Sequence, residues 1–182
     1  IAASAGNHGQ GVSLAAKKLK IRSTIVMPQT TPSVKVTSVK RLGSDVILHG
    51  DSYSDAFEEA MKIAKRSKKQ LIHPFDDMHV IAGQGTIGME IIRQMSEPID
   101  AIFIAVGGGG LISGIGCYIK SIRPEIKIIG VQTTDSDAMV RSIEIGKRIK
   151  LKHVGIFSDG TAVKQVGTET FKLAKIVVDD FC

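Results

Sequence analysis

Short apolar runs alternate with longer amphipathic stretches along most of this chain. The runs are rich in β-branched residues and predict strands, whereas stretches with apolar residues three or four positions apart predict helices. We expect strands at residues 1–3, 23–27, 45–49, 70–73, 100–106, 127–132 and 175–178. We expect helices at residues 9–19, 32–42, 52–66, 85–95, 111–122, 138–145 and 169–174. This alternation predicts an α/β fold with βαβ units, in which two open, mostly parallel, twisted sheets are flanked by helices.

The segment His-Pro-Phe-Asp-Asp at residues 73–77 interrupts this rhythm near the middle of the chain. We therefore place a domain boundary there, with a small, partial α/β domain at residues 1–74 and part of a larger domain at residues 75–182. The strand expected at residues 100–106 is apolar nearly throughout, which is typical of a parallel strand that is buried on both faces.

Composition and charge exclude several classes of function. The 182 residues carry a net charge of +6, mostly in lysine-rich segments at predicted helix ends, where cations are favourable. Aromatic residues do not interleave with these cations, so we expect no nucleic-acid partner. No apolar run reaches the ~18 residues of a membrane span. Cys117 and Cys182 have neither zinc-site nor disulfide spacing, which fits a reducing compartment, either the cytoplasm or, in a plant, the plastid.

Four consecutive glycines, Gly107 to Gly110, follow the strand expected at residues 100–106. Each glycine loses much backbone freedom on folding, so such a run indicates that the backbone must come close to a ligand. Backbone N–H groups at a helix start can surround an anion. The run lacks the glycine spacing of a dinucleotide fingerprint and the Gly-Lys-Ser/Thr of a P-loop. It therefore predicts a site for a single monophosphate that the backbone holds.

A second motif, Ser-Ala-Gly-Asn-His-Gly-Gln-Gly, occupies residues 4–11. It turns a short strand sharply into a helix and contains small residues around the polar side chain of Asn7. We interpret it as a second anion site. The alternative is an ordinary helix start with Ser4 or Asn7 as the capping residue.

These two motifs and the segment at residues 80–90 together resemble the signature segments of fold-type II pyridoxal-phosphate enzymes, in the same order. Their amino-acid sequences are similar to those of the threonine dehydratase and serine racemase branch, and residues 159–171 resemble the biosynthetic threonine dehydratases. The resemblance implies a tryptophan synthase β-like fold and pyridoxal 5′-phosphate as the cofactor. It also implies deamination of L-threonine to 2-oxobutanoate and ammonia, the first step toward isoleucine.

The resemblance also assigns residues to roles. Backbone N–H groups would hold the cofactor phosphate at Gly107, Gly108, Gly109, Gly110 and Leu111. Asn7 would bond to the 3′-hydroxyl of the cofactor ring. The loop that binds the substrate carboxylate would comprise Ser4, Ala5, Gly6, Asn7 and His8. Residues 84–86 would shape the site without a chemical role.

Two residues of the family's site have no counterpart in this chain. The lysine that carries the cofactor would lie upstream of Ile1, and the serine that meets the pyridine nitrogen would lie beyond Cys182. We therefore expect an incomplete domain that is inactive alone, derived from an enzyme that forms a homo-oligomer. We expect no metal, because Gln132 stands where the serine racemase pattern has a glutamate. The alternatives are a serine racemase or serine dehydratase of the same fold, and a non-catalytic module that binds a phosphate-bearing ligand.

Overall fold

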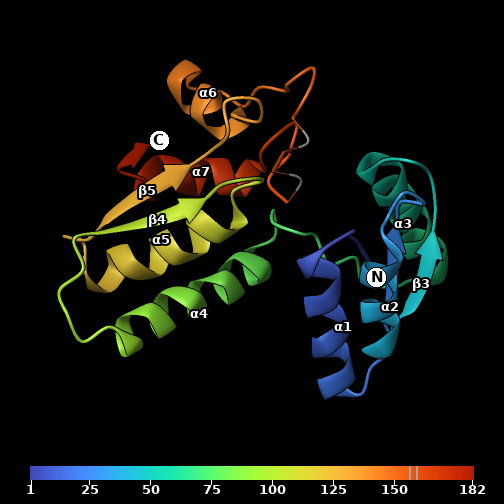
Figure 1. Cartoon of the computed structure of the whole chain (residues 1–182). Helices are drawn as coiled ribbons and strands as arrows, with labels where there is room; N and C mark the ends of the chain where they lie inside the picture. The colour runs from blue at the N-terminus through green and yellow to red at the C-terminus, as the bar shows by residue number, and fades with distance from the viewer. Residues whose placement is uncertain (156, 159) are drawn as a thin grey trace. The chain divides into compact units, whose positions relative to one another are not determined.

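Two three-stranded parallel sheets organise the residues that this computed structural model describes, which are 1–155, 157–158 and 160–182. The strands are β1 (Ala2–Ala3), β2 (Thr24–Met27), β3 (Asp45–Leu48), β4 (Ala101–Ala105), β5 (Lys127–Val131) and β6 (Asp180–Phe181). The helices are α1 (Asn7–Leu19), α2 (Ser33–Arg41), α3 (Tyr53–Ser67), α4 (Met78–Gln94), α5 (Gly110–Ile122), α6 (Ala138–Ile145) and α7 (Thr168–Val177). The chain divides into two compact units, Ile1–Pro74 and Phe75–Cys182, which carry one sheet each (Figure 1).

The first unit has helices on both faces of the sheet β1-β2-β3. Side chains alternate between the faces of a strand. Val26 therefore packs with Ala60 of α3 on one face, whereas Ile25 and Met27 pack with Val39 of α2 on the other. All of β2 is buried, as a central parallel strand should be.

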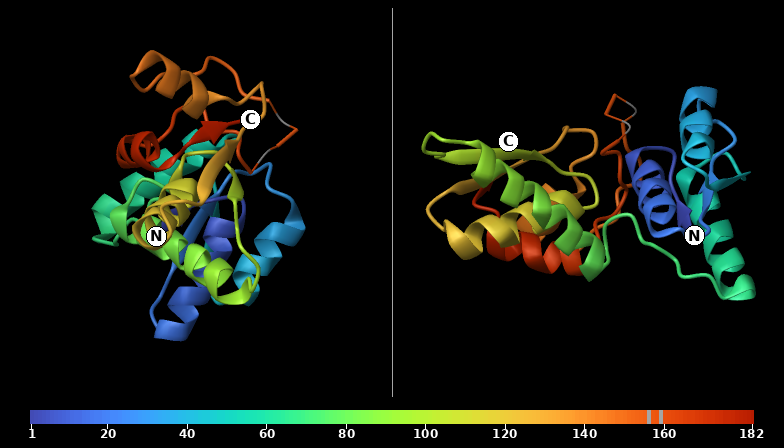
Figure 2. Two further views of the ribbon diagram at one scale, coloured as in Figure 1. Left: turned by 90° about the vertical axis from the view of Figure 1, so that its left-hand side faces the viewer. Right: turned by 90° about the horizontal axis from the view of Figure 1, so that it is seen from below.

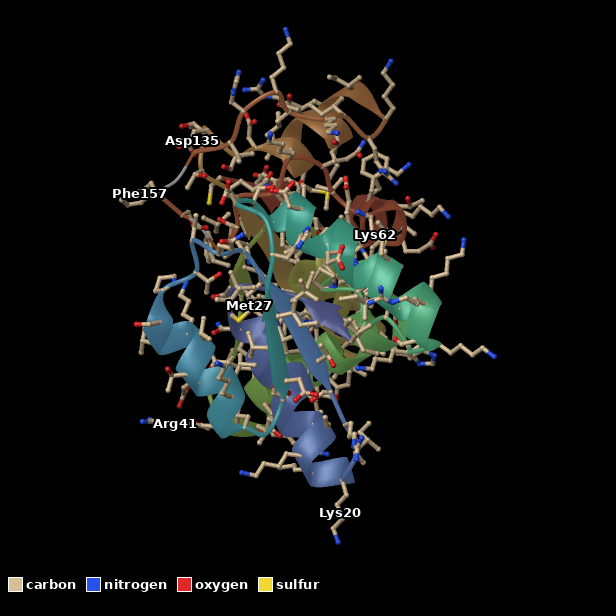
Figure 3. All side chains as sticks on the ribbon, turned by 90° about the vertical axis from the view of Figure 1, so that its right-hand side faces the viewer. Lys20, Met27, Arg41, Lys62, Asp135 and Phe157 are labelled. Atoms are coloured by element: carbon tan, nitrogen blue, oxygen red, sulfur yellow. The ribbon has the colours of Figure 1, made fainter. Side chains whose placement is uncertain are left out.

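Cationic side chains of this first unit lie on its surface. Lys20, Arg41 and Lys62 point away from the ribbon (Figure 3). Lys20 is the C-cap of α1, with φ 56°, and Arg41 is the last residue of α2, so both cations lie near the negative ends of helix dipoles.

None of the helices that the described residues form has the length and apolar character needed to cross a membrane.

The second unit has the parallel sheet β4-β5-β6 and a core of β4, β5, α5 and α7 side chains. Ile104 and Ile128 on one face of the sheet belong to the same buried cluster as Ile112 of α5 and Phe171 of α7. Helix α4 packs along α5, and Figure 2 shows this unit from two further directions. Gly114 permits the close crossing, since a Cβ there would lie 2.3 Å from the carbonyl oxygen of Ile81.

The predicted α/β class with two parallel sheets is confirmed, but several details of the prediction are wrong. Residues 70–73 form no strand, although Ile72 N–H donates to Ile1 O at 2.9 Å beside β1. Residues 175–177 end α7 instead of forming a strand, because Phe171, Ala174 and Val177 recur at helical spacing and are buried. Strand β4 is not buried on both faces: Phe103 is 66% exposed.

The other boundaries differ for local reasons. Helix α4 begins seven residues earlier than expected, at Met78, because the Asp77 carboxylate accepts the His79 and Val80 N–H groups. A short strand that the sequence did not predict, β6, follows α7 and pairs with β5. Asp159, the first residue of the stretch that resembles the biosynthetic dehydratases, lies outside the described residues.

Candidate functional site

The glycine run forms the turn between β4 and α5. Strand β4 ends at Ala105, and Gly110 begins α5. Gly109 is the N-cap, with φ 98° and ψ −3°, a backbone conformation that side-chain-bearing residues rarely adopt. Gly108, Gly109 and Gly110 are buried. The predicted turn from strand to helix is therefore present at these residues.

The Cβ positions of these glycines face the protein. A Cβ on Gly108 would lie 2.4 Å from the Phe75 ring, and one on Gly109 would lie 2.6 Å from Met139 Cε and 2.8 Å from Thr170 Cβ. The run consists of glycine because neighbouring side chains pack directly on the backbone. A side chain on Gly109 would thus meet Met139 and Thr170, and this clash does not depend on a ligand.

The N–H groups of this turn have no acceptor among the residues that the structure describes. Within the described part of the chain, no oxygen accepts a hydrogen bond from the backbone N–H groups of residues 107–112; the first intrahelical bond is from Ser113 N–H to Gly109 O, at 3.0 Å. Buried N–H groups at a helix start normally have a partner. The positive end of the α5 dipole adds to their attraction for negative charge. The turn therefore fits a bound anion such as a phosphate.

The loop at residues 4–8 connects β1 to α1 and leaves this helix without a side-chain cap. The N-cap is Gly6, with no side-chain hydrogen bond, so neither Ser4 nor Asn7 caps the helix as the alternative interpretation required. Instead, buried Ser4 accepts the Gly6 N–H through its Oγ at 3.1 Å and shapes the turn. Asn7 is exposed at the start of the helix. This helix start is therefore also open to an anion.

His8 has a defined ring orientation and charge state. Its Nε2 lies 3.2 Å from the Ile72 carbonyl oxygen, which can only accept, so Nε2 carries the proton. Burial lowers the pKa of His8, and nearby His73 lowers it further, although the bond to Ile72 acts in the opposite direction. The neutral imidazole is therefore favoured near pH 7. The other residue of the loop, Ala5, is half-buried.

Two other predicted positions serve packing or helix capping. Gly85 of α4 lies against α5, where a Cβ would be 3.1 Å from Gly114 O, so this glycine permits the helix crossing. Gln132 uses its whole amide within the second unit. Its Nε2 donates to Val106 O and Ser136 O, and its Oε1 accepts the N–H groups at the start of α6. The described residues form no cluster suited to a metal ion.

Phe75 and Asp76, which lie in the segment that marks the predicted domain boundary, have contacts that the sequence did not indicate. Phe75 packs on the glycine turn, and the Asp76 carboxylate accepts three N–H groups at the start of α7. The local signal was weak, because the partners of Asp76 lie more than ninety residues later in the chain.

Comparison with known proteins agrees with this geometry. The model of the pyridoxal-phosphate dependent enzyme family matches residues 1–182. This chain belongs to that family. Membership confirms the resemblance, the type of fold and the expected cofactor.

Relatives within the family point to one branch. The chain is 55% identical over 181 residues to the mitochondrial threonine dehydratase of Schizosaccharomyces pombe, covering 99% of this chain and 30% of that protein. It is 54% identical over 182 residues to a biosynthetic L-threonine dehydratase of Burkholderia multivorans, covering 98% of this chain and 36% of that protein. The chain thus spans about a third of the curated relatives it matches.

Two solved structures share the fold of this chain. The processed form of threonine deaminase isoform 2 from Solanum lycopersicum superposes with a TM-score of 0.95 at 46% identity, covering 100% of this chain and 50% of that one. Maize serine racemase superposes with a TM-score of 0.93 at 34% identity, covering 99% of this chain and 54% of that one.

Proposed function

We propose that this chain is part of a pyridoxal-phosphate-dependent threonine dehydratase that converts L-threonine to 2-oxobutanoate and ammonia. The observation that carries the proposal is the turn at residues 107–112, which is buried at residues 108–110 and whose N–H groups have no acceptor among the described residues. Such a turn suits the phosphate ester of the family's cofactor. The names of the relatives at 55% and 54% identity support threonine as the substrate.

In this proposal the second unit, residues 75–182, is part of the cofactor-binding domain. The N–H groups of Gly107, Gly108, Gly109, Gly110 and Leu111 bind the phosphate, and the α5 dipole stabilises its charge. The bound cofactor supplies an electron sink for the electrons released at the substrate Cα. The protein supplies binding and orientation, since the backbone of this turn is already shaped around the anion site.

The first unit, residues 1–74, is proposed as the small domain that binds the substrate. The loop of Ser4, Ala5, Gly6, Asn7 and His8 would bind the substrate carboxylate, chiefly through the N–H groups at the start of α1, which no side chain caps. The Asn7 side chain would bond to the 3′-hydroxyl of the cofactor. His8, held neutral by its buried surroundings, adds no fixed positive charge to this loop at neutral pH.

Serine racemization or dehydration is the second candidate, because the solved maize serine racemase shares this fold at 34% identity. An assay of the full-length protein that contains this chain separates the two. It should form 2-oxobutanoate from L-threonine faster than it forms pyruvate or D-serine from L-serine. A clear preference for L-serine would contradict the proposed substrate.

The role of Asn7 is tested in the same full-length protein. We expect Asn7→Ala to reduce kcat/KM for L-threonine by about 10- to 100-fold, the equivalent of the ~1.5–3 kcal/mol that a hydrogen bond to a charged group contributes. The matched control is Gln94→Ala, which removes an exposed side-chain amide that donates to Glu90 of the same helix. Unchanged kinetics for Asn7→Ala would remove this residue from the site.

A further inference from the structure

We propose that Asp76 is a positioning residue that, through Thr170, holds the phosphate-binding turn in its binding shape. This inference rests on the proposed function, because it takes the turn at Gly107 to Leu111 to be the cofactor's phosphate site. Asp76 acts by fixing the first turn of α7, and α7 in turn holds the backbone of Gly108.

The first step is the capping of α7 by a residue distant in sequence. The N-cap of this helix is Gly167, which has no side chain to accept an N–H group. The Asp76 carboxylate takes that role: its Oδ2 accepts the Thr168 N–H at 2.8 Å, and its Oδ1 accepts those of Glu169 at 2.8 Å and Thr170 at 3.2 Å. Three bonds to a charged acceptor, at the positive end of the helix dipole, fix the start of α7 firmly.

Gly167 is needed for this approach. Its φ of −66° and ψ of 164° suit any residue, so its backbone conformation does not require glycine. A Cβ there, however, would lie 2.2 Å from Asp76 Oδ1 and 2.6 Å from Thr170 Oγ1. The missing side chain therefore makes room for the distant carboxylate and for Thr170.

The second step is the link from α7 to the glycine turn. The carbonyl oxygen of Gly108 accepts two hydrogen bonds, from Thr170 Oγ1 at 2.6 Å and from Gly167 N–H at 3.2 Å. Thr170 is fully buried, and its own carbonyl accepts the Ser113 hydroxyl of α5 at 3.2 Å. A peptide unit is planar and trans, so fixing the Gly108 carbonyl also fixes the direction of the Gly109 N–H. That N–H belongs to the set proposed to bind phosphate.

Phe75 restrains the same turn by packing. Its ring lies 2.4 Å from the position that a Cβ of Gly108 would take, and its backbone lies 3.0 Å from the Cβ position of Gly110. The dipeptide Phe75–Asp76 thus acts on the turn in two ways, by direct packing and through α7.

The arrangement also decides which helix start receives the ligand. Two helices, α5 and α7, begin beside Gly108, and each has first-turn N–H groups without an acceptor in its own helix and a positive dipole end. The Asp76 carboxylate accepts N–H groups at the start of α7, whereas no described side chain accepts the N–H groups at the start of α5. An incoming phosphate is therefore directed to α5.

The test measures cofactor binding by the full-length apoenzyme, with pyridoxal 5′-phosphate and phosphate-free pyridoxal as the two probes. Thr170→Val and Asp76→Asn should each raise the Kd for pyridoxal 5′-phosphate by about 10-fold, the loss typical of one disrupted hydrogen bond to a charged group. The Kd for pyridoxal should change by less than about two-fold, because the phosphate contacts alone are disturbed. Thr170→Ser, which keeps the hydroxyl, should restore most of the affinity.

The matched control is Asp77→Asn. Asp77 is the next residue and also caps a helix, but the N–H groups that its carboxylate accepts, those of His79 and Val80, belong to α4 and not to α7. It should leave both Kd values within about two-fold of the unsubstituted protein. Circular dichroism checks that each variant folds; if Asp76→Asn does not, the Thr170→Val and Thr170→Ser pair decides the question.

Three results would overturn the inference. These are an unchanged Kd for pyridoxal 5′-phosphate in Thr170→Val, an equal loss for both probes, and an unsubstituted protein that binds pyridoxal 5′-phosphate no more tightly than pyridoxal. Failure of the proposed reaction is distinguishable: a protein that shows the expected binding pattern but forms no 2-oxobutanoate would refute the proposed function and leave the role of Asp76 intact.

Discussion

Replacing Gly109 by alanine tests whether this glycine is required by packing or by the ligand. Its φ of 98° costs an alanine about 1–2 kcal/mol. The new methyl group would also lie 2.6 Å from Met139 Cε and 2.8 Å from Thr170 Cβ, and such overpacking costs about 1–3 kcal/mol. The lower entropy of the unfolded alanine variant offsets part of this, about 0.4–1 kcal/mol. We expect Gly109→Ala to destabilise the unit by about 2–4 kcal/mol.

The assay is native-state hydrogen exchange of β4 and β5 in the full-length apoenzyme, which reports the opening free energy of this unit without the cofactor. The control is Gly83→Ala in α4, where a Cβ meets no atom within 4 Å and should stabilise the helix by about 0.5–1 kcal/mol. If the methyl group only blocked the phosphate, the apoenzyme would be unaffected and cofactor affinity alone would fall. An opening free energy unchanged within about 0.5 kcal/mol would therefore refute the packing argument.

A second pair of variants tests polar contacts of the same unit by urea unfolding of the apoenzyme. Burial by itself would raise the pKa of Asp179, but the Lys120 ammonium and the Ile128 N–H outweigh it and lower that pKa below 3.8. The stabilisation by this carboxylate is therefore present above pH 3.8 and lost as the pH falls below that value. The free energy of unfolding that Asp179→Asn loses at pH 7 should accordingly become smaller toward pH 3. A loss that does not depend on pH would contradict this. Gln132→Glu replaces the amide donor to Val106 O by a carboxylate oxygen and should cost at least about 2 kcal/mol, since a buried acceptor loses its partner. An unchanged unfolding midpoint would show that this amide is dispensable.

Much of the fold could be predicted because its signals are local. The β-branched run at residues 24–27 and the amphipathic stretch at 53–67 each specify an element through neighbours a few positions away. The residues at 175–177 misled the prediction because Ile176 and Val177 favour strands intrinsically. Burial of Val177 against α5, where it lies beside Gly116, outweighs that preference.

The candidate site shows the same division. The glycine turn and the loop at residues 4–8 could be found from composition and spacing, since runs of small residues between a strand and a helix are rare without a reason. The sequence indicated only in part why glycine is required at these positions. Packing of Phe75 on Gly108 and of Met139 on Gly109 cannot be inferred from the local sequence, because these side chains come from distant segments.

Most of the order of secondary structure, the parallel sheets and the glycine turn were determined by the sequence itself, because hydrophobic periodicity and glycine placement act over a few residues. Only the tertiary structure decided that a carboxylate at position 76 caps a helix that begins at position 168. It also decided that one face of β4 stays exposed. Such features depend on which distant surfaces meet in three dimensions, and a local pattern carries no information about that encounter.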